Sequence, residues 1–154
     1  VIPANEQVSM GTGVSEVVLD NALFWELEFW FKVGAVAVGK AAELFGRAHG
    51  VYAAGSRSWR VDQDGYIEML VGGVGITKGN ESTVVCDDDE WHHFRVKYSG
   101  DSRLSWYVDG LRQHHQAYSS TTDDPSYNLY MGYWGPAAGG ENVVRIASPT
   151  YRLL

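Results

Sequence analysis

The pattern that decides the fold lies in Glu90-Trp91-His92-His93-Phe94-Arg95-Val96-Lys97-Tyr98 and in Leu104-Ser105-Trp106-Tyr107-Val108-Asp109-Gly110. In both segments apolar and polar side chains alternate, which is typical of a strand with one buried face. We expect an inward set of His92, Phe94, Val96 and Tyr98 opposite Leu104, Trp106 and Val108, and an outward set of Trp91, His93, Arg95 and Lys97. Asp109-Gly110 is expected to form a hairpin turn, because both residues tolerate positive φ angles.

The same alternation recurs elsewhere. From Leu23 to Val33 one face carries Trp25, Leu27, Phe29, Phe31 and Val33, and the other carries Glu26, Glu28 and Lys32. A second hairpin is expected around Asp64-Gly65, between strands at 58–63 and 66–71. Further strands are expected at 43–48, 111–118, 127–133, 143–146 and 151–154. The only helix-like segment, Lys40 to Leu44, is too short to be convincing.

Many short strands at this spacing predict an all-β fold with two packed antiparallel sheets. The 154 residues fit one domain, which we place at 1–154, and are enough for a full core without disulfides. Cys86 is the single cysteine, so no internal disulfide and no CxxC metal motif is available. Its simplest role is that of a small buried residue.

These segments resemble the laminin G-like domains of the concanavalin A-like lectin and glucanase jelly roll. In that family a tryptophan and paired histidines open one strand, and the next runs through an aromatic residue, Val and Asp to Gly at a turn. Three more segments are similar to family strands: Gln7-Val8-Ser9-Met10-Gly11, Leu27-Glu28-Phe29-Trp30-Phe31-Lys32 and Asn128-Leu129-Tyr130-Met131-Gly132. The resemblance covers nearly the whole chain and implies a jelly-roll sandwich. Family members often carry an acidic residue in the strand at 142–148, where Arg145 and Ser148 stand here, which weakens the transfer of a metal site.

The charge of the chain bears on its partners. A formal net charge of -7, with no run of basic residues, repels polyphosphate and anionic lipid. We therefore expect neither nucleic acid nor membrane insertion, and no stretch reaches the roughly 20 apolar residues of a membrane span. Because the sequence begins at Val1, we interpret it as processed at its N-terminus or as a segment of a longer protein.

Glu26 and Glu28 are the carboxylates that most suggest catalysis. Two acids on one strand face can act as nucleophile and general acid in glycoside hydrolysis. Glycosidases that share this jelly roll carry a third acid on the same face, but here Trp30 and Lys32 follow instead. No glycine-flanked nucleophile is present either. The favoured interpretation is a solvated strand face, and we expect no enzymatic activity.

Metal ligands are considered next. Adjacent histidines on a strand point to opposite faces, so neither His92-His93 nor His114-His115 chelates an ion alone. A packing role is favoured for His92-His93, although one histidine of each pair could meet across a sheet. Acidic loops attract calcium, for which Asp87, Asp89 and Asp123 are the candidate ligands. The simpler interpretation of Asp87-Asp88-Asp89-Glu90 is a solvated turn, and no cofactor is firmly indicated.

Aromatic residues make up 13% of the chain, and not all of them fit the inward sets. Outward rings stack on sugars or anchor protein partners. Tyr133 and Trp134 open a glycine-rich loop, which either displays a ring or caps an open sheet edge. The candidate stacking residues are Trp134, Tyr133, Trp30 and Trp59, and the candidate polar contacts are Glu26, Glu28, His93 and Arg95.

The favoured function is recognition or adhesion, with a glycan or polysaccharide as ligand, in an extracellular, cell-surface or virion setting. One alternative is a structural or decoration subunit of a virion or surface assembly that contacts other copies of itself. Another is a glycosidase or polysaccharide lyase.

Overall fold

The computed structural model describes residues 8–11, 24–47, 57–71, 81–99, 103–117, 129–131 and 144–154. These residues form strands and no helix. The strands are β1 (Val8–Gly11), β2 (Trp25–Val33), β3 (Ala42–Arg47), β4 (Arg57–Val61), β5 (Tyr66–Val71), β6 (Glu81–Val85), β7 (His92–Tyr98), β8 (Arg103–Val108), β9 (Leu111–Ala117), β10 (Leu129–Met131) and β11 (Val144–Leu153). Within the described part of the chain there is consequently no helix that could cross a membrane.

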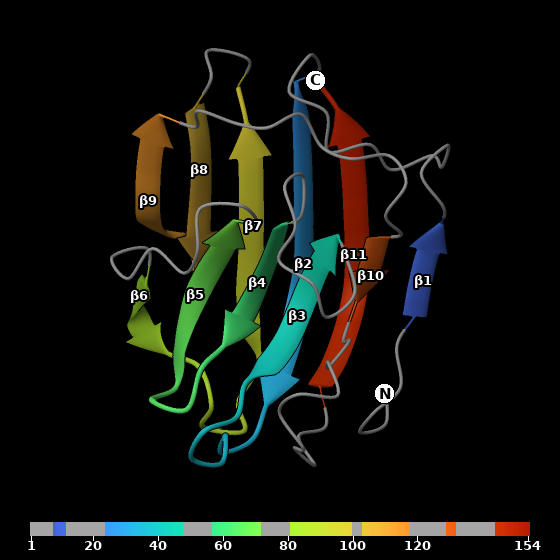
Figure 1. Cartoon of the computed structure of the whole chain (residues 1–154). Coiled ribbons are helices and arrows are strands. Elements are labelled where there is room, and N and C mark those ends of the chain that lie inside the picture. Colours follow the sequence, from blue (N-terminus) through green and yellow to red (C-terminus); the bar gives the residue numbers. More distant parts are fainter. Residues whose placement is uncertain are drawn as a thin grey trace.

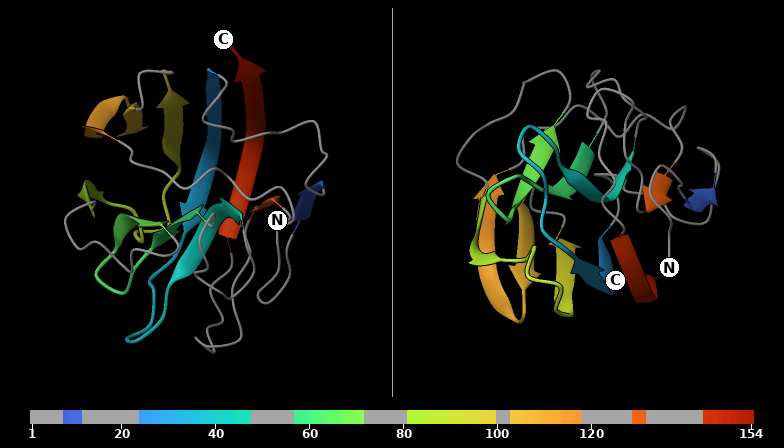
Figure 2. Two further views of the ribbon diagram at one scale, coloured as in Figure 1. Left: turned by 45° about the horizontal axis from the view of Figure 1, so that its top comes forward. Right: turned by 90° about the horizontal axis from the view of Figure 1, so that it is seen from below.

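The strands form two antiparallel sheets that face each other (Figures 1 and 2). One sheet has six strands in the order β1-β10-β3-β4-β5-β6, and the other has five in the order β11-β2-β7-β8-β9. Strands distant in the sequence are neighbours in both sheets, as β10 beside β3 and β11 beside β2 show. The predicted all-β jelly-roll sandwich is confirmed.

The core lies between the sheets and is mainly aromatic. Phe29 on β2 is at its centre, with ring centroids 5.2 Å from Phe94 and 6.4 Å from Phe45. Phe45 lies on β3 of the opposite sheet and stacks on its cross-strand partner Trp59 of β4, at 4.9 Å and 10°. Such ring pairs add to the free energy gained from apolar burial. The inward sets predicted for β2, β7 and β8 are all buried, as the alternation required.

Two predicted hairpin turns are present and use the expected residues. Asp109 and Gly110 connect β8 to β9 with φ angles of 50° and 78°. Gly65, between β4 and β5, has φ of 84°, and a Cβ there would meet Asp87 Oδ1 at 2.3 Å. Glycine is therefore required at this turn both by the backbone angle and by the nearby carboxylate.

The strand expected at 43–48 is β3, and the helix-like segment Lys40 to Leu44, which is too short to be convincing, overlaps its start. Two other features differ from the sequence expectation. The segments at 143–146 and 151–154 are one strand, β11, which continues past Ser148 (φ 51°) through a register shift. β6 was not predicted, because this short strand pairs only with β5 and does not bury a full apolar face.

Candidate functional site

The outer face of the six-stranded sheet carries a row of charged side chains. Glu43 on β3 is the cross-strand partner of Arg60 on β4, and Arg60 is the partner of Glu68 on β5. Trp59 and Val61 flank Arg60 in the sequence and are buried in the core. Since successive side chains of a strand alternate between faces, the row points away from the core.

The members of this row have different environments. Arg60 donates from Nε to Glu68 Oε1, and Glu68 is only 7% exposed, so this ion pair is largely shielded from water. Burial raises the pKa of Glu43 from 4.5 to about 7, while the Ser58 hydroxyl and the Arg60 guanidinium act in the opposite direction. The row therefore combines an acid that keeps its proton near neutral pH with a carboxylate paired to a cation.

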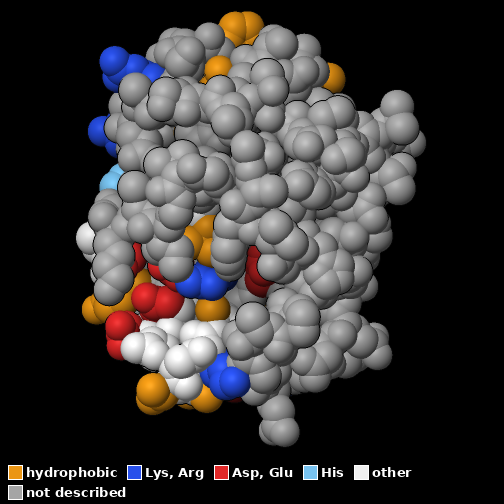
Figure 3. All heavy atoms as spheres, in the orientation of Figure 1, with side chains coloured by type: hydrophobic (Ala, Val, Ile, Leu, Met, Phe, Trp, Pro, Cys, Tyr) orange, Lys and Arg blue, Asp and Glu red, His pale blue; other side chains and the backbone are white. Residues whose placement is uncertain are grey.

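The spacing of the two acids follows from the sheet. Glu43 and Glu68 lie two strands apart, which separates their backbones by about 9.5 Å, since neighbouring strands are about 4.8 Å apart. Arg60 stands between them. Figure 3 views this side of the molecule and shows basic and acidic side chains together at a recessed part of the surface. Such an arrangement can donate a proton on one side of a bound group and accept one on the other.

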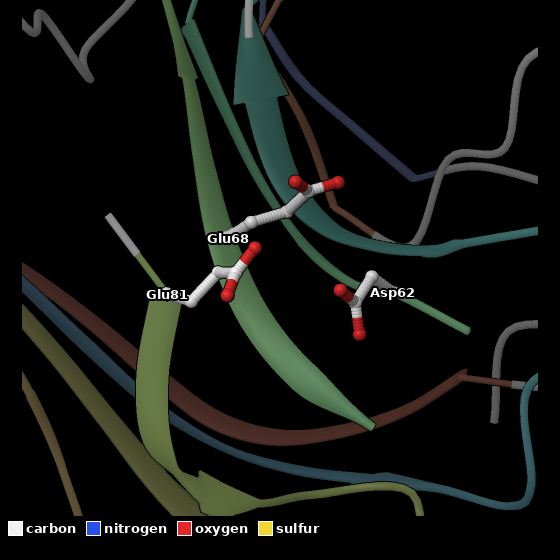
Figure 4. A group of neighbouring side chains, drawn as sticks. All are labelled: Asp62, Glu68 and Glu81. Atoms are coloured by element: carbon white, nitrogen blue, oxygen red, sulfur yellow. The ribbon is translucent and has the colours of Figure 1, made fainter. Parts of the chain in front are cut away.

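A second group of acids adjoins the row. Oxygens of Asp62, Glu68 and Glu81 lie within 4.8 Å of one another, and Figure 4 shows the three side chains converging from β5, β6 and the turn after β4. Asp62 Oδ1 already accepts from the backbone N–H groups of Asp64 and Tyr66, at 3.0 and 2.9 Å. Because Glu68 is also paired with Arg60, two of the three acids have donors within the protein, and we do not assign a metal here.

The outer face of the five-stranded sheet carries the predicted polar contacts. Arg152 on β11 donates to Glu26 Oε1 from Nε at 2.8 Å and to Glu28 Oε1 from Nη2 at 3.2 Å. His93 Nε2 lies 3.7 Å from Glu28 Oε2. Glu26 is buried and fully engaged by Arg152, so its role is to hold β11 against β2 rather than to contact a ligand.

Aromatic and cationic side chains complete this second face. Trp30 is 45% exposed and lies against His93, with ring centroids 5.0 Å apart. The guanidinium of Arg95 lies over the ring of Tyr107, 4.3 Å from its centroid. Arg95 Nε is buried and has no hydrogen-bond partner among the residues that the structure describes.

The structure sorts the predicted ligand-binding residues into three groups. Glu26, Glu28, Trp30, His93 and Arg95 are brought together on one sheet face. Trp59 is fully buried and stacked on Phe45, so its prediction as a surface stacking residue is wrong. The strand register places it on the core face of β4, one position from the outward Arg60. Tyr133 and Trp134 lie outside the described residues.

The histidines and the acidic loop have structural partners. His92 bonds through Nδ1 to Asp109 Oδ2 at 2.8 Å and through Nε2 to Asp88 Oδ1 at 3.0 Å. Asp89 pairs with Lys32 and Arg145, and Asp87 Oδ2 accepts from the Val36 N–H. Asp87 and Asp89, proposed as calcium ligands, thus face different partners rather than one centre. The third candidate, Asp123, lies outside the described residues.

The row of Glu43, Arg60 and Glu68 was missed in the sequence. Its local signal is present, because each of the three is a charged residue between apolar neighbours in a strand. That pattern indicates an outward position on each strand separately. It does not indicate that the three positions share a row, which depends on strand order and register.

The chain belongs to the concanavalin A-like lectin/glucanases superfamily, whose laminin G model matches residues 15–143. The resemblance stated from the sequence is therefore confirmed. No curated protein matches the chain.

Solved structures with this fold have varied activities. An alginate lyase from Corynebacterium sp. is 10% identical over 91% of this chain, with a TM-score of 0.63. A Trypanosoma rangeli sialidase is 14% identical over 99% of this chain (TM-score 0.65), and domains LG4-5 of the mouse laminin alpha1 chain are 17% identical over 99% (TM-score 0.61). The chain spans 63%, 25% and 41% of these proteins respectively, and identities this low establish a shared fold alone.

These similarities correct one expectation. The sequence suggested that the chain is not an enzyme, because no acidic triplet follows Glu26 and Glu28. Lyases and sialidases nevertheless share the fold, so the exclusion of catalysis is overturned. That expectation rested on the acids of β2, whereas the charged row with a proton-holding carboxyl lies on the other sheet.

Proposed function

We propose that this chain is a carbohydrate-active domain that cleaves glycosidic bonds on the outer face of its six-stranded sheet. The single observation that supports this most is the row of Glu43, Arg60 and Glu68 across three neighbouring strands. Glycoside hydrolysis needs two carboxyl groups with different protonation on either side of the bond. Glu43 is the proton donor in this scheme and Glu68 is the carboxylate that activates water.

The chemical step is a direct displacement. Glu43 transfers its proton to the glycosidic oxygen as the bond from that oxygen to the anomeric carbon breaks. Glu68 takes a proton from a water molecule whose oxygen attacks the same carbon from the opposite side. The scheme requires the two carboxyl groups to lie about 6.5 to 9.5 Å apart, as in inverting enzymes, and the backbones that carry them are about 9.5 Å apart. The product is expected to have the inverted anomeric configuration.

Arg60 has a positioning role in this scheme. Its ion pair with Glu68 fixes the orientation of that side chain. Its positive charge also lowers the pKa of Glu43, in the direction opposite to burial. The same cation would attract a substrate that carries a carboxylate. The fold shared with an alginate lyase and a sialidase, whose names refer to acidic sugars, fits this proposal.

The test is turnover on a panel of polysaccharides. The chain is incubated with alginate, a sialylated glycan and a neutral glucan, and new reducing ends are counted. Glu43→Gln and Glu68→Gln are each expected to lower the rate by about 100-fold or more, the usual contribution of a general acid or base. Glu90→Gln, in the exposed loop before β7, is the matched control and should keep full activity.

The products decide between reaction types. Hydrolysis gives saturated ends, whereas a lyase leaves a carbon–carbon double bond that absorbs in the ultraviolet. An unsaturated product would show that the bond is cleaved by elimination and not by hydrolysis. Absence of product from every polysaccharide, or equal rates for wild type and both variants, would overturn the proposed function.

A further inference from the structure

The outer face of the five-stranded sheet is a second surface suited to sugars, on the opposite side of the sandwich from the row of Glu43, Arg60 and Glu68. It is built on β11, β2 and β7, which form the longest ladders among the described strands. The side chains of β2 and β7 are fixed by paired backbone on both sides, and β11 is the edge strand. The surface is therefore preorganised, which reduces the entropy lost when a ligand binds.

Its first feature is an aromatic platform. Trp30 and His93 are cross-strand partners, and their rings are tilted by 48° with centroids 5.0 Å apart. Trp30 exposes 45% of its surface, although its neighbours Phe29 and Phe31 are fully buried. An indole held in place on one side and open to solvent on the other can stack on the flat face of a sugar ring.

Its second feature is a pair of cations, Arg95 and Lys97, which follow His93 on the same face of β7. Their cross-strand neighbours on β2 are Glu28 and Glu26, but those glutamates pair with Arg152, and among the described residues neither cation forms an ion pair. The ring of Tyr107 packs against one face of the Arg95 guanidinium. A guanidinium fixed in this way presents its planar edge, which matches a carboxylate or sulfate. Arg95 lies diagonally across the strand pair from Trp30, at a separation of about 7 to 8 Å.

The charge of this face is opposite to that of the whole chain. Its outward strand positions carry the five cations Lys32, Arg95, Lys97, Arg145 and Arg152 and the carboxylates of Glu26 and Glu28, and Asp89 in the loop before β7 pairs with Lys32 and Arg145. Arg152 pairs with both glutamates. The chain as a whole has a net charge of -7. A basic surface on an otherwise acidic protein attracts an anionic ligand to that surface, while the acidic remainder of the molecule repels the ligand.

We propose that this face binds an anionic polysaccharide, with a sugar ring stacked on Trp30 and the acidic group of the sugar held by Arg95 and Lys97. The shared chemistry is an anionic group on a pyranose, which a uronic acid or a sulfated sugar supplies. The binding surface is separate from the proposed cleavage row, so either proposal can fail without the other.

The test is isothermal titration calorimetry with polygalacturonate, performed in the Glu43→Gln variant so that cleavage cannot consume the polymer. Trp30→Ala and Arg95→Gln are each expected to weaken binding by about tenfold, the usual effect of losing a stacking contact or a charge-assisted hydrogen bond. Arg95→Lys keeps the charge but loses the planar edge, and should fall in between.

Two matched controls separate a site from general attraction. Trp91 is also 45% exposed, but it precedes β7 and does not belong to the platform, so Trp91→Ala should bind as the parent does. Arg145→Gln removes one positive charge from the same sheet face, where Asp89 already pairs with it, and should change affinity less than twofold. Far-ultraviolet circular dichroism checks that each variant is folded.

The outcomes are distinct. Equal weakening by Trp30→Ala, Arg95→Gln, Trp91→Ala and Arg145→Gln, or by none of them, would overturn the proposal, as would equal affinity for fully methyl-esterified, neutral polygalacturonate. Binding of heparin instead of polygalacturonate would support the surface and identify sulfate as its anion. Absence of turnover by the wild-type chain, together with polygalacturonate binding that Trp30→Ala and Arg95→Gln weaken, would overturn the cleavage row and leave this inference standing by itself.

Discussion

Among the carboxyl groups of the described residues, Glu43 departs furthest from its ordinary pKa. Its pKa of about 7 results from burial, which the Ser58 hydroxyl and Arg60 only partly offset. Ionisation of a buried acid lowers the stability of the fold, so stability alone would favour an apolar side chain at this position. A buried acid in the same row as a paired carboxylate is therefore typical of functional sites.

This residue makes the stability of the fold depend on pH. The folded state holds the Glu43 proton up to about pH 7 and the unfolded state only to about 4.5, so stability falls as pH rises through this window. Glu43→Gln should remove the dependence and stabilise the fold above pH 7 by at most about 3 kcal/mol, at about 1.4 kcal/mol per pKa unit. Urea unfolding from pH 4 to 8 measures it, and parallel curves for wild type and variant would contradict it.

Two tryptophans offer a direct contrast at the same scale. Trp59 is fully buried and Trp30 is half-exposed. Trp59→Ala leaves a large cavity and should destabilise the fold by about 3 to 5 kcal/mol, whereas Trp30→Ala should cost less than about 1 kcal/mol. Chemical denaturation of both variants compares them. Similar losses would show that Trp30 is a structural residue and would remove the platform from the further proposal.

At the scale of elements, His92 connects three parts of the molecule. It lies on β7 and bonds to Asp109 in the turn after β8 and to Asp88 in the acidic loop. Asp109 also accepts from the His93 N–H through Oδ1 at 2.8 Å. The paired histidines that resembled a metal motif thus secure the β7–β8 hairpin, in agreement with the packing role favoured from the sequence.

The same contacts give a second pH dependence. Burial lowers the pKa of His92, but the hydrogen bonds and charges of Asp109 and Asp88 outweigh it, so the pKa is raised overall. The stabilisation that these contacts give is fully present below the His92 pKa of the unfolded state, about 6.5. It is lost as pH rises through the His92 pKa of the folded state. His92→Phe should reduce stability by about 1 to 2 kcal/mol at pH 6 and by less at pH 9. Thermal unfolding at both pH values measures the difference, and an equal loss at each would contradict the charged clamp.

At the scale of the whole molecule, the two sheets present two different surfaces. One carries the proposed cleavage row and the other the proposed anionic-glycan surface, with the aromatic core between them. Because facing sheets are about 10 Å apart and each surface points outward, no side chain belongs to both. A polymer could reach both faces only by passing around an edge of the sandwich.

This separation predicts independent losses. Trp30→Ala should leave turnover of a short soluble oligosaccharide unchanged and should lower turnover of a dilute polymer, because a second attachment raises the effective concentration of the chain at the cleavage row. Initial rates on the two substrates, measured side by side, provide the comparison. A matching fall on the short substrate would mean that the two faces are coupled.

The sequence by itself determined the all-β class, the two hairpins and the inward and outward faces of β2, β7 and β8. These features depend on alternation between adjacent residues, which is local and has a period of two. For the same reason the grouping of Glu28, Trp30, His93 and Arg95 on one face was predictable once their strands were known.

Only the tertiary structure decided which strands are neighbours and in which register. Glu43, Arg60 and Glu68 stand on three strands, and nothing local in the sequence aligns them. Their row forms because packing of the aromatic core selects one register for β3, β4 and β5, in which Phe45 opposes Trp59 and the charged residues are brought together on the other side. A slip of one residue would turn Arg60 inward and Trp59 outward, and burial of the core excludes it.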